Sequence, residues 1–165
     1  MSERYHAFPQ LIGDQPKILI LGTFPSPISR EKGEYYGNAQ NKFWNIIFDV
    51  FGVKFDNPDY TEKQKVLFDN GIALWDVIES CEIIGALDSA IKKPLYNTAL
   101  PEFIKSNDIS TVVFNGQKAY AFYKKGIGDS DGIVLPSTSP ANAGMSYDAK
   151  LSAWEKALKP MEGLL

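Results

Sequence analysis

Apolar residues in this chain form short runs that alternate with segments of helical periodicity. The runs, bounded by glycine, proline or asparagine, predict four buried strands: Lys17–Thr23, Gly71–Val77, Thr111–Asn115 and Gly132–Leu135. Apolar positions three and four residues apart predict helices at Asn41–Gly52, Thr61–Asn70, Pro101–Asn107, Gln117–Lys125 and Tyr147–Leu158. The pattern therefore predicts an α/β protein, a three-layer α/β/α sandwich around a four-stranded, mainly parallel sheet.

Polar loops follow the predicted strands at the end where ligands normally bind to such a sheet. In an open parallel sheet, that end is the edge formed by the carboxyl ends of the strands. The loops carry Pro25 and Ser26, Trp75 and Asp76, Asn115 and Gly116, and the run Ser137 to Asn142. We expect these loops to converge on one pocket.

The segment from Tyr35 to Trp44 is the richest in candidate chemistry. Its ten residues, YYGNAQNKFW, contain two tyrosines, two asparagines and a Phe-Trp pair. Aromatic rings can stack on a flat ring, and asparagine amides can orient water or read polar edges. The segment therefore predicts a pocket for a nucleobase.

Length and composition fit one globular domain spanning residues 1–165. The chain has 165 residues, of which 44% are hydrophobic and 22% charged. No apolar run approaches the roughly 18 residues of a membrane helix, and the first ten residues lack a signal-peptide core. We expect a soluble cytoplasmic protein that does not bind membranes. The net charge of −3 argues against broad polyanion binding, although folding could assemble a small basic face.

Metal and cofactor chemistry have little support in the sequence. Cys81 is the single cysteine and His6 the single histidine, so neither a disulfide nor a zinc ligand set can be formed. The Gly22–Ser26 loop, GTFPS, contains neither a GxGxxG motif nor a P-loop lysine. We expect no metal and no cofactor.

Six segments together resemble the uracil-DNA glycosylase superfamily, and within it the hypoxanthine-DNA glycosylase group. They are GTFPS (22–26), YYGNAQNKFW (35–44), GIALWDV (71–77), SCEIIGALD (80–88), FNG (114–116) and LPSTSPANA (135–143). The resemblance extends from Lys17 to Trp154 and implies a uracil-DNA glycosylase-like sandwich. It also implies a monomeric DNA glycosylase of base excision repair, which would remove hypoxanthine first, and uracil or xanthine second, leaving an abasic site in DNA.

The same resemblance assigns roles to individual residues. Asn41 falls where the hypoxanthine group carries its catalytic asparagine, and Phe24 falls where other relatives carry the Asp or Asn that positions water. Tyr36 falls on the ring that stacks on the extruded base, and Asp76 where an asparagine often reads the base edge. Ala39 departs from the group, in which proline is commoner there. The expected base-binding residues are Phe24, Tyr36, Asp76 and Asn115.

An amide is too weak a base to take a proton at neutral pH, so Asn41 would orient water through its carbonyl oxygen. The same side chain could instead cap the following helix, and the two roles are compatible. A carboxylate at Asp76 would favour a base with a ring N–H beside a carbonyl, such as hypoxanthine or uracil, over adenine. Alternatively, Asp76 caps the turn that follows its strand.

The remaining candidates would shape the cleft and hold DNA phosphates through hydroxyl and backbone N–H groups. They are Gly22, Pro25, Ser26, Ser137, Thr138 and Ser139. Serine and proline also favour simple turns, so turn formation is the alternative role. The Ser137–Asn142 run has no large apolar side chain to fill the gap left by an extruded base, which leaves Met145 as the candidate wedge.

Three other functions remain open from the sequence. A glycosylase acting chiefly on uracil in mismatches would differ only in its pocket. A catalytically inactive module that binds damaged DNA is suggested by Phe24 and Ala39. A hydrolase of free nucleosides is compatible with the acidic pI of about 5.2.

Overall fold

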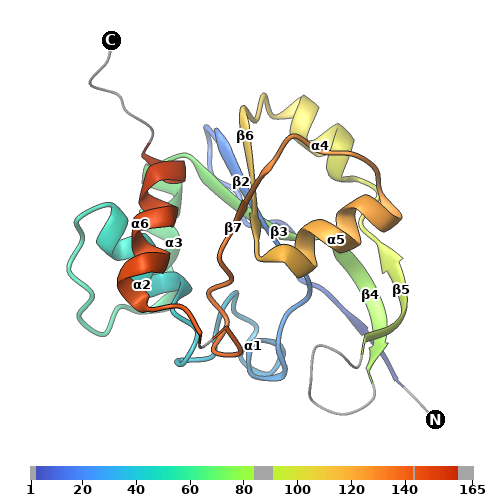
Figure 1. The fold of residues 1–165 in the computed structure, drawn as a ribbon, viewed down its shortest axis with the longest axis horizontal. Coiled ribbons are helices and arrows are strands. Elements are labelled where there is room, and N and C mark those ends of the chain that lie inside the picture. The colour runs from blue at the N-terminus through green and yellow to red at the C-terminus, as the bar shows by residue number, and fades with distance from the viewer. Residues whose placement is uncertain (1–2, 84–90, 143, 160–165) are drawn as a thin grey trace.

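A parallel sheet of four strands forms the middle layer of the molecule (Figure 1). The computed structural model describes residues 3–83, 91–142 and 144–159. Along the sheet the strands are ordered β3 (Ile72–Asp76), β2 (Ile18–Gly22), β6 (Thr111–Asn115) and β7 (Ile133–Leu135). Each neighbouring pair is parallel. The four predicted strands are therefore confirmed, and their carboxyl ends meet at one edge.

Helices cover both faces of this sheet, as the three-layer prediction requires (Figure 1). Leu19 and Leu21 pack with residues of α4 (Leu100–Ser106) and α5 (Gln117–Gly126). Ile20 points the other way, into a cluster with α2 (Phe43–Val50), α3 (Tyr60–Asp69) and α6 (Tyr147–Leu158). Successive residues of a strand face opposite sides, so one apolar run supplies both cores.

The helix boundaries follow local capping signals. Helix α3 begins one residue earlier than predicted because Asp59, rather than Thr61, is its N-cap. The Asp59 carboxylate accepts a hydrogen bond from the Glu62 N–H at 2.8 Å, and the Glu62 carboxylate accepts one from the Asp59 N–H at 3.4 Å. In α6, Trp154 and Leu158 are buried, and Leu151 packs against the same core.

The sequence prediction missed a second sheet. It contains β1 (Arg4–His6), β4 (Ile78–Ile83) and β5 (Ile91–Tyr96), all antiparallel, with β4 in the middle. Only Val77 separates β4 from β3, so the two strands read as one apolar run. β5 carries two lysines and a proline and is largely exposed, which is typical of an edge strand.

A short helix, α1 (Pro27–Lys32), lies where the prediction placed only a loop. The Ser26 hydroxyl accepts a hydrogen bond from the Ser29 N–H, and Pro27 occupies the first helical position. Six residues are too few to show helical periodicity, so only the Ser-Pro pair signals this helix. No helix in the described part of the chain is long and apolar enough to cross a membrane.

Candidate active site

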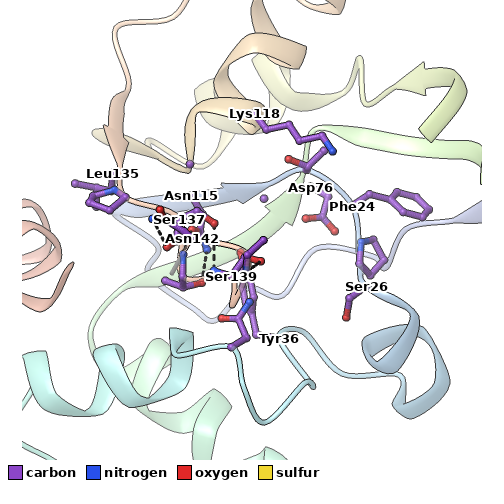
Figure 2. Close-up of a pocket in the computed structure, with 18 of the residues that line it drawn as sticks. Phe24, Ser26, Tyr36, Asp76, Asn115, Lys118, Leu135, Ser137, Ser139 and Asn142 are labelled. Carbon is purple, nitrogen blue, oxygen red and sulfur yellow. Dashed lines mark hydrogen bonds between the residues drawn. The ribbon is translucent and has the colours of Figure 1, made fainter. Parts of the chain in front are cut away.

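A cavity of about 760 Å³ lies at the carboxyl ends of the parallel strands (Figure 2). Every candidate site residue predicted from the sequence lines it: Gly22, Phe24, Pro25, Ser26, Tyr36, Asn41, Asp76, Asn115, Ser137, Thr138 and Ser139. Trp75 does not; its ring packs edge-on against Phe103 at 4.9 Å between centroids. Because Trp75 and Asp76 are adjacent on a strand, they face opposite sides of the sheet.

Asn41 lies just before α2, and its side chain is held in place. The carbonyl oxygen Oδ1 accepts a hydrogen bond from the Phe43 N–H at 2.9 Å, while the Asn41 N–H donates to the Asn38 carbonyl at 2.9 Å. Asn41 therefore satisfies the first N–H of α2 from the position before the N-cap residue, Lys42, whose own side chain makes no capping bond. An amide oxygen has two lone pairs, so a second acceptor direction is left for a ligand or water in the cavity.

The Tyr36 ring forms part of the cavity wall. It stacks on Phe43 with 4.0 Å between centroids and 23° between planes, so only its opposite face and its hydroxyl can meet a ligand. Its backbone has φ 53°, which is a strained value for a bulky residue. Gly37 holds the segment in this conformation through its N–H, which donates to the Ser29 hydroxyl at 2.9 Å. Strain of this kind is common where a side chain must be aimed.

Asp76 ends β3 and is buried, with 5% of its surface exposed. Its oxygen Oδ2 has no hydrogen-bond partner, and burial raises the pKa of this carboxyl from 3.8 to about 7. The Asn97 side-chain amide donates to the Asp76 backbone carbonyl at 3.1 Å and so fixes the end of the strand. The side chain is thus close to half neutral at pH 7, whereas the sequence led us to expect a carboxylate.

Gly22 makes room for the polar groups of the pocket. A Cβ atom at this position would lie 2.7 Å from Asp76 Oδ1 and 3.0 Å from the Tyr36 hydroxyl. Both polar groups therefore converge on the space above Gly22, at the end of β2.

Asn115 and Thr138 tie two of the loops together. The Thr138 N–H donates to Asn115 Oδ1 and the Asn115 amide donates back to the Thr138 hydroxyl, each at 3.0 Å. Thr138 is 1% exposed, and its carbonyl accepts the Lys42 N–H at 3.1 Å, immediately before α2. Thr138 thus has a structural role, because its N–H donates to Asn115 and its buried hydroxyl accepts from the Asn115 amide, while the phosphate contact expected of it stays a prediction. The Asn115 side chain also hydrogen-bonds to the Tyr36 hydroxyl, so the two side chains are held together at the cavity wall, and the contact of Asn115 with a base stays a prediction.

Comparison with known proteins shows the family of this chain. The family model described as the uracil DNA glycosylase superfamily matches residues 9–159. This chain belongs to that superfamily.

Relatives within the superfamily match nearly the whole chain. A protein of Methanosarcina acetivorans named hypoxanthine DNA glycosylase is 35% identical over 156 residues, which is 92% of this chain and 96% of the relative. A protein of the same name from Methanosarcina barkeri is 32% identical over 154 residues, with the same coverage. A solution NMR structure from Methanosarcina acetivorans, named for uracil DNA glycosylase, has a TM-score of 0.76 and 34% identity. The match covers 97% of this chain and 99% of that structure. The predicted fold is confirmed.

The serines of this superfamily member build turns while keeping a donor for a ligand. The Ser137 hydroxyl accepts the Ser139 N–H at 3.1 Å, and the Ser139 hydroxyl accepts the Ala141 N–H at 3.2 Å. In each case the hydroxyl proton is left to donate toward the cavity. Ser26 differs, because it both caps α1 and donates to the Ser29 hydroxyl at 3.2 Å.

Sequence reasoning missed Arg30 as a support for the β2–α1 loop. Its guanidinium donates to the Pro25 carbonyl at 2.8 Å and lies 4.7 Å from the Tyr5 ring centroid and 5.8 Å from that of Phe24. These contacts couple β1 to the cavity wall, and a single arginine in a loop gives no pattern that would reveal them.

Lys118 and Asn142 also line the cavity and were not predicted as site residues. Lys118 is in the first turn of α5, and Asn142 donates to the Ser137 carbonyl at 3.1 Å. The position of Lys118 just after the FNG motif could have identified it.

Met145, the wedge candidate, lines the cavity and is 40% exposed. Residues 84–88 of the SCEIIGALD motif and Ala143 lie outside the described residues.

Cys81, the single cysteine, lies in the core. It is fully buried in β4, and burial raises the pKa of its thiol, which disfavours the reactive thiolate.

Proposed function

We propose that this chain is a DNA glycosylase that removes deaminated bases, hypoxanthine first and uracil or xanthine second, and leaves an abasic site. One observation carries the proposal: in a member of the uracil DNA glycosylase superfamily, Asn41, Tyr36 and Asp76 line one cavity. An oriented amide, an aromatic face and a buried carboxyl are what holding and hydrolysing an extruded nucleobase requires. The relatives named hypoxanthine DNA glycosylase support the choice of base.

Asn41 would position the water that attacks the sugar. The Phe43 N–H holds its carbonyl oxygen from one side, so a water molecule would donate to the remaining lone pair. Water then bonds to C1′ as the bond between C1′ and the base nitrogen breaks. The sugar passes through an oxocarbenium-like state, and proton loss from water follows bond breaking, so Asn41 contributes orientation rather than basicity.

Tyr36 and Asp76 would hold the base itself. The free face of the Tyr36 ring stacks on the base, while Phe43 supports the ring from behind. Asp76 faces the polar edge of the base.

Phe24 offers only an apolar wall, so its side chain has no part in activating water. The hydroxyls of Ser137 and Ser139 and the neighbouring backbone N–H groups would contact phosphates.

Substitution of Asn41 tests the catalytic assignment. We expect Asn41→Ala to slow single-turnover excision of hypoxanthine from an inosine-containing duplex by about 100-fold, because the water loses its orientation. Binding of the duplex should change little. Asn45→Ala is the matched control, since Asn45 is on α2 outside the cavity lining. Near-wild-type excision by Asn41→Ala, with binding intact, would show that the assignment is wrong.

A non-catalytic module that binds damaged DNA is the second candidate. It is favoured by the hydrogen bond between Asn41 Oδ1 and the Phe43 N–H, which a purely structural cap would also form. End-labelled duplexes containing inosine, uracil or xanthosine distinguish the two when abasic sites are cleaved with alkali. Tight binding with no base release from any duplex would favour the module.

A further inference from the structure

Asp76 has a buried polar atom that the protein leaves unsatisfied. Among the described residues, Asp76 Oδ2 is the one buried side-chain nitrogen or oxygen without a hydrogen-bond partner. A buried polar atom that the protein itself leaves without a partner is unfavourable, and at a cavity wall it points to a ligand group that hydrogen-bonds to it. Asp76 lines the cavity, and Figure 2 shows its side chain among the lining residues together with Tyr36 and Lys118.

The chemistry of the ligand decides which form of the carboxyl fits. Hypoxanthine and uracil present a ring N–H next to a carbonyl oxygen. A carboxylate has only acceptors, so one oxygen would accept the N–H while the other faced the carbonyl oxygen unfavourably. A neutral carboxyl has one acceptor and one donor, and it therefore matches both groups.

We propose that Asp76 reads the extruded base as a neutral carboxylic acid that accepts a hydrogen bond from the ring N–H and donates one to the neighbouring carbonyl oxygen as the base leaves. This assignment rests on the proposed function. The donated hydrogen bond strengthens as negative charge develops on the departing base, so it favours bond breaking as well as recognition.

The atoms balance without a further reactant. The bond between C1′ and the base nitrogen breaks, and its electron pair goes to the base. Water oxygen bonds to C1′ and releases a proton to solvent, and the departing base takes a proton from solvent. Asp76 keeps its own proton throughout, so it acts as a hydrogen-bond donor and is unchanged after each turnover.

The surroundings of Asp76 favour the neutral form more than water does, so that neutral and charged forms are about equally populated near pH 7. Burial raises the pKa of its carboxyl to about 7. Tyr35 and Tyr36 face it from the segment before α2, and both have raised pKa values, chiefly through burial, so they stay neutral. Lys118 lines the cavity from α5 and is the cation on this side. Its charge would favour the carboxylate, but burial is the dominant influence on Asp76.

Asparagine provides a matched variant, because its amide always has one donor and one acceptor in the same shape. Single-turnover excision from an inosine duplex is measured at saturating protein between pH 6 and pH 8.5, for wild type, Asp76→Asn and Asp76→Ala. Wild-type excision should fall by about 30-fold over this range as the neutral fraction declines. The Asp76→Asn variant should not show this decline. The ratio of its excision rate to that of wild type should therefore rise by about 30-fold between pH 6 and pH 8.5. Asp76→Ala should be slow throughout.

An infrared spectrum reports the protonation state without relying on activity. Wild type should have a protonated-carboxyl stretch at pH 6 that disappears by pH 8.5 and is absent in Asp76→Asn. A wild-type rate that is flat or rises with pH would overturn the proposal, as would a parallel decline in Asp76→Asn or absence of the infrared band at pH 6. If wild type releases no base at any pH, the proposed function itself fails, and the infrared band still reports on Asp76.

Discussion

Gly22 shows how one residue can determine whether a pocket exists. A Cβ atom there would overlap Asp76 Oδ1 and crowd the Tyr36 hydroxyl. We expect Gly22→Ala to push these two groups apart, to slow single-turnover excision by about 100-fold and to lower the free energy of unfolding by about 1–3 kcal/mol. Gly144→Ala is the control, because no heavy atom lies within 4 Å of a Cβ at that position. Equal rates for both variants would contradict this account.

Asp76 should also make the stability of the protein depend on pH. Its carboxyl has a pKa of about 7 when folded and near 3.8 when unfolded. Below pH 4 both states hold the proton, and the contribution of Asp76 is fully present. As pH rises from 4 to 7 the unfolded state releases its proton first, so stability is lost across this window and is constant above it.

Asp76→Asn cannot titrate, so its unfolding free energy relative to wild type should increase between pH 4 and pH 7. The gain should be at most about 4 kcal/mol, from about three pKa units at 1.36 kcal/mol each. Urea unfolding at pH 4, 5.5, 7 and 8 measures it. If the difference in unfolding free energy between the two proteins does not change with pH, folding does not raise the pKa of Asp76.

At the scale of elements, the two hydrogen bonds between Asn115 and Thr138 hold the β7–α6 loop against β6 and α2. We expect Asn115→Ala to lower the unfolding free energy by about 1–3 kcal/mol, because the buried Thr138 N–H loses its acceptor. Thr138→Val keeps that backbone bond and removes only the hydroxyl, so its loss should be smaller. Denaturant unfolding of the two variants gives the comparison, and a larger loss for Thr138→Val would contradict the assignment.

Elements with local signals were the ones that the sequence could predict. Strands β2, β3, β6 and β7 are continuous apolar runs, and α2 and α6 have clear periodicity, so each was found from its own residues. The second sheet was missed because its evidence is non-local: the Arg4 guanidinium of β1 donates to Ser80 of β4, 76 residues away. Short, exposed strands have no run of their own to reveal them.

The same distinction applies to the site. Family motifs predicted which residues line the cavity, including Asn41 and Tyr36, because each motif is a continuous segment. They did not reveal which polar atoms the protein itself occupies. The Asn115–Thr138 pair spans 23 residues, and only the folded chain shows that the Thr138 N–H is already bonded to Asn115. The neutral tendency of Asp76 likewise depends on burial, which no motif states.

At the scale of the whole molecule, a net charge of −3 means that DNA must be attracted by local cations. Lys118, in the cavity lining, is well placed for this role. We expect Lys118→Ala to weaken duplex binding and to lower the slope of log K against log salt by about 0.9, the effect of one lost phosphate contact. Lys65→Ala is the control, because Lys65 pairs with Asp69 on α3. An unchanged salt slope for Lys118→Ala would exclude this contact.

Tyr5, at the centre of β1, lies under the guanidinium of Arg30, which in turn holds the Pro25 carbonyl at the rim of the cavity. Strand β1 is thus linked through Arg30 to the cavity wall. Shortening the chain by its first strand would bare the hydrogen-bonding groups along one side of β4 and free Arg30 from an aromatic support. We expect any such trimmed form to lose support for the β2–α1 loop, although residues 4–6 do not line the cavity.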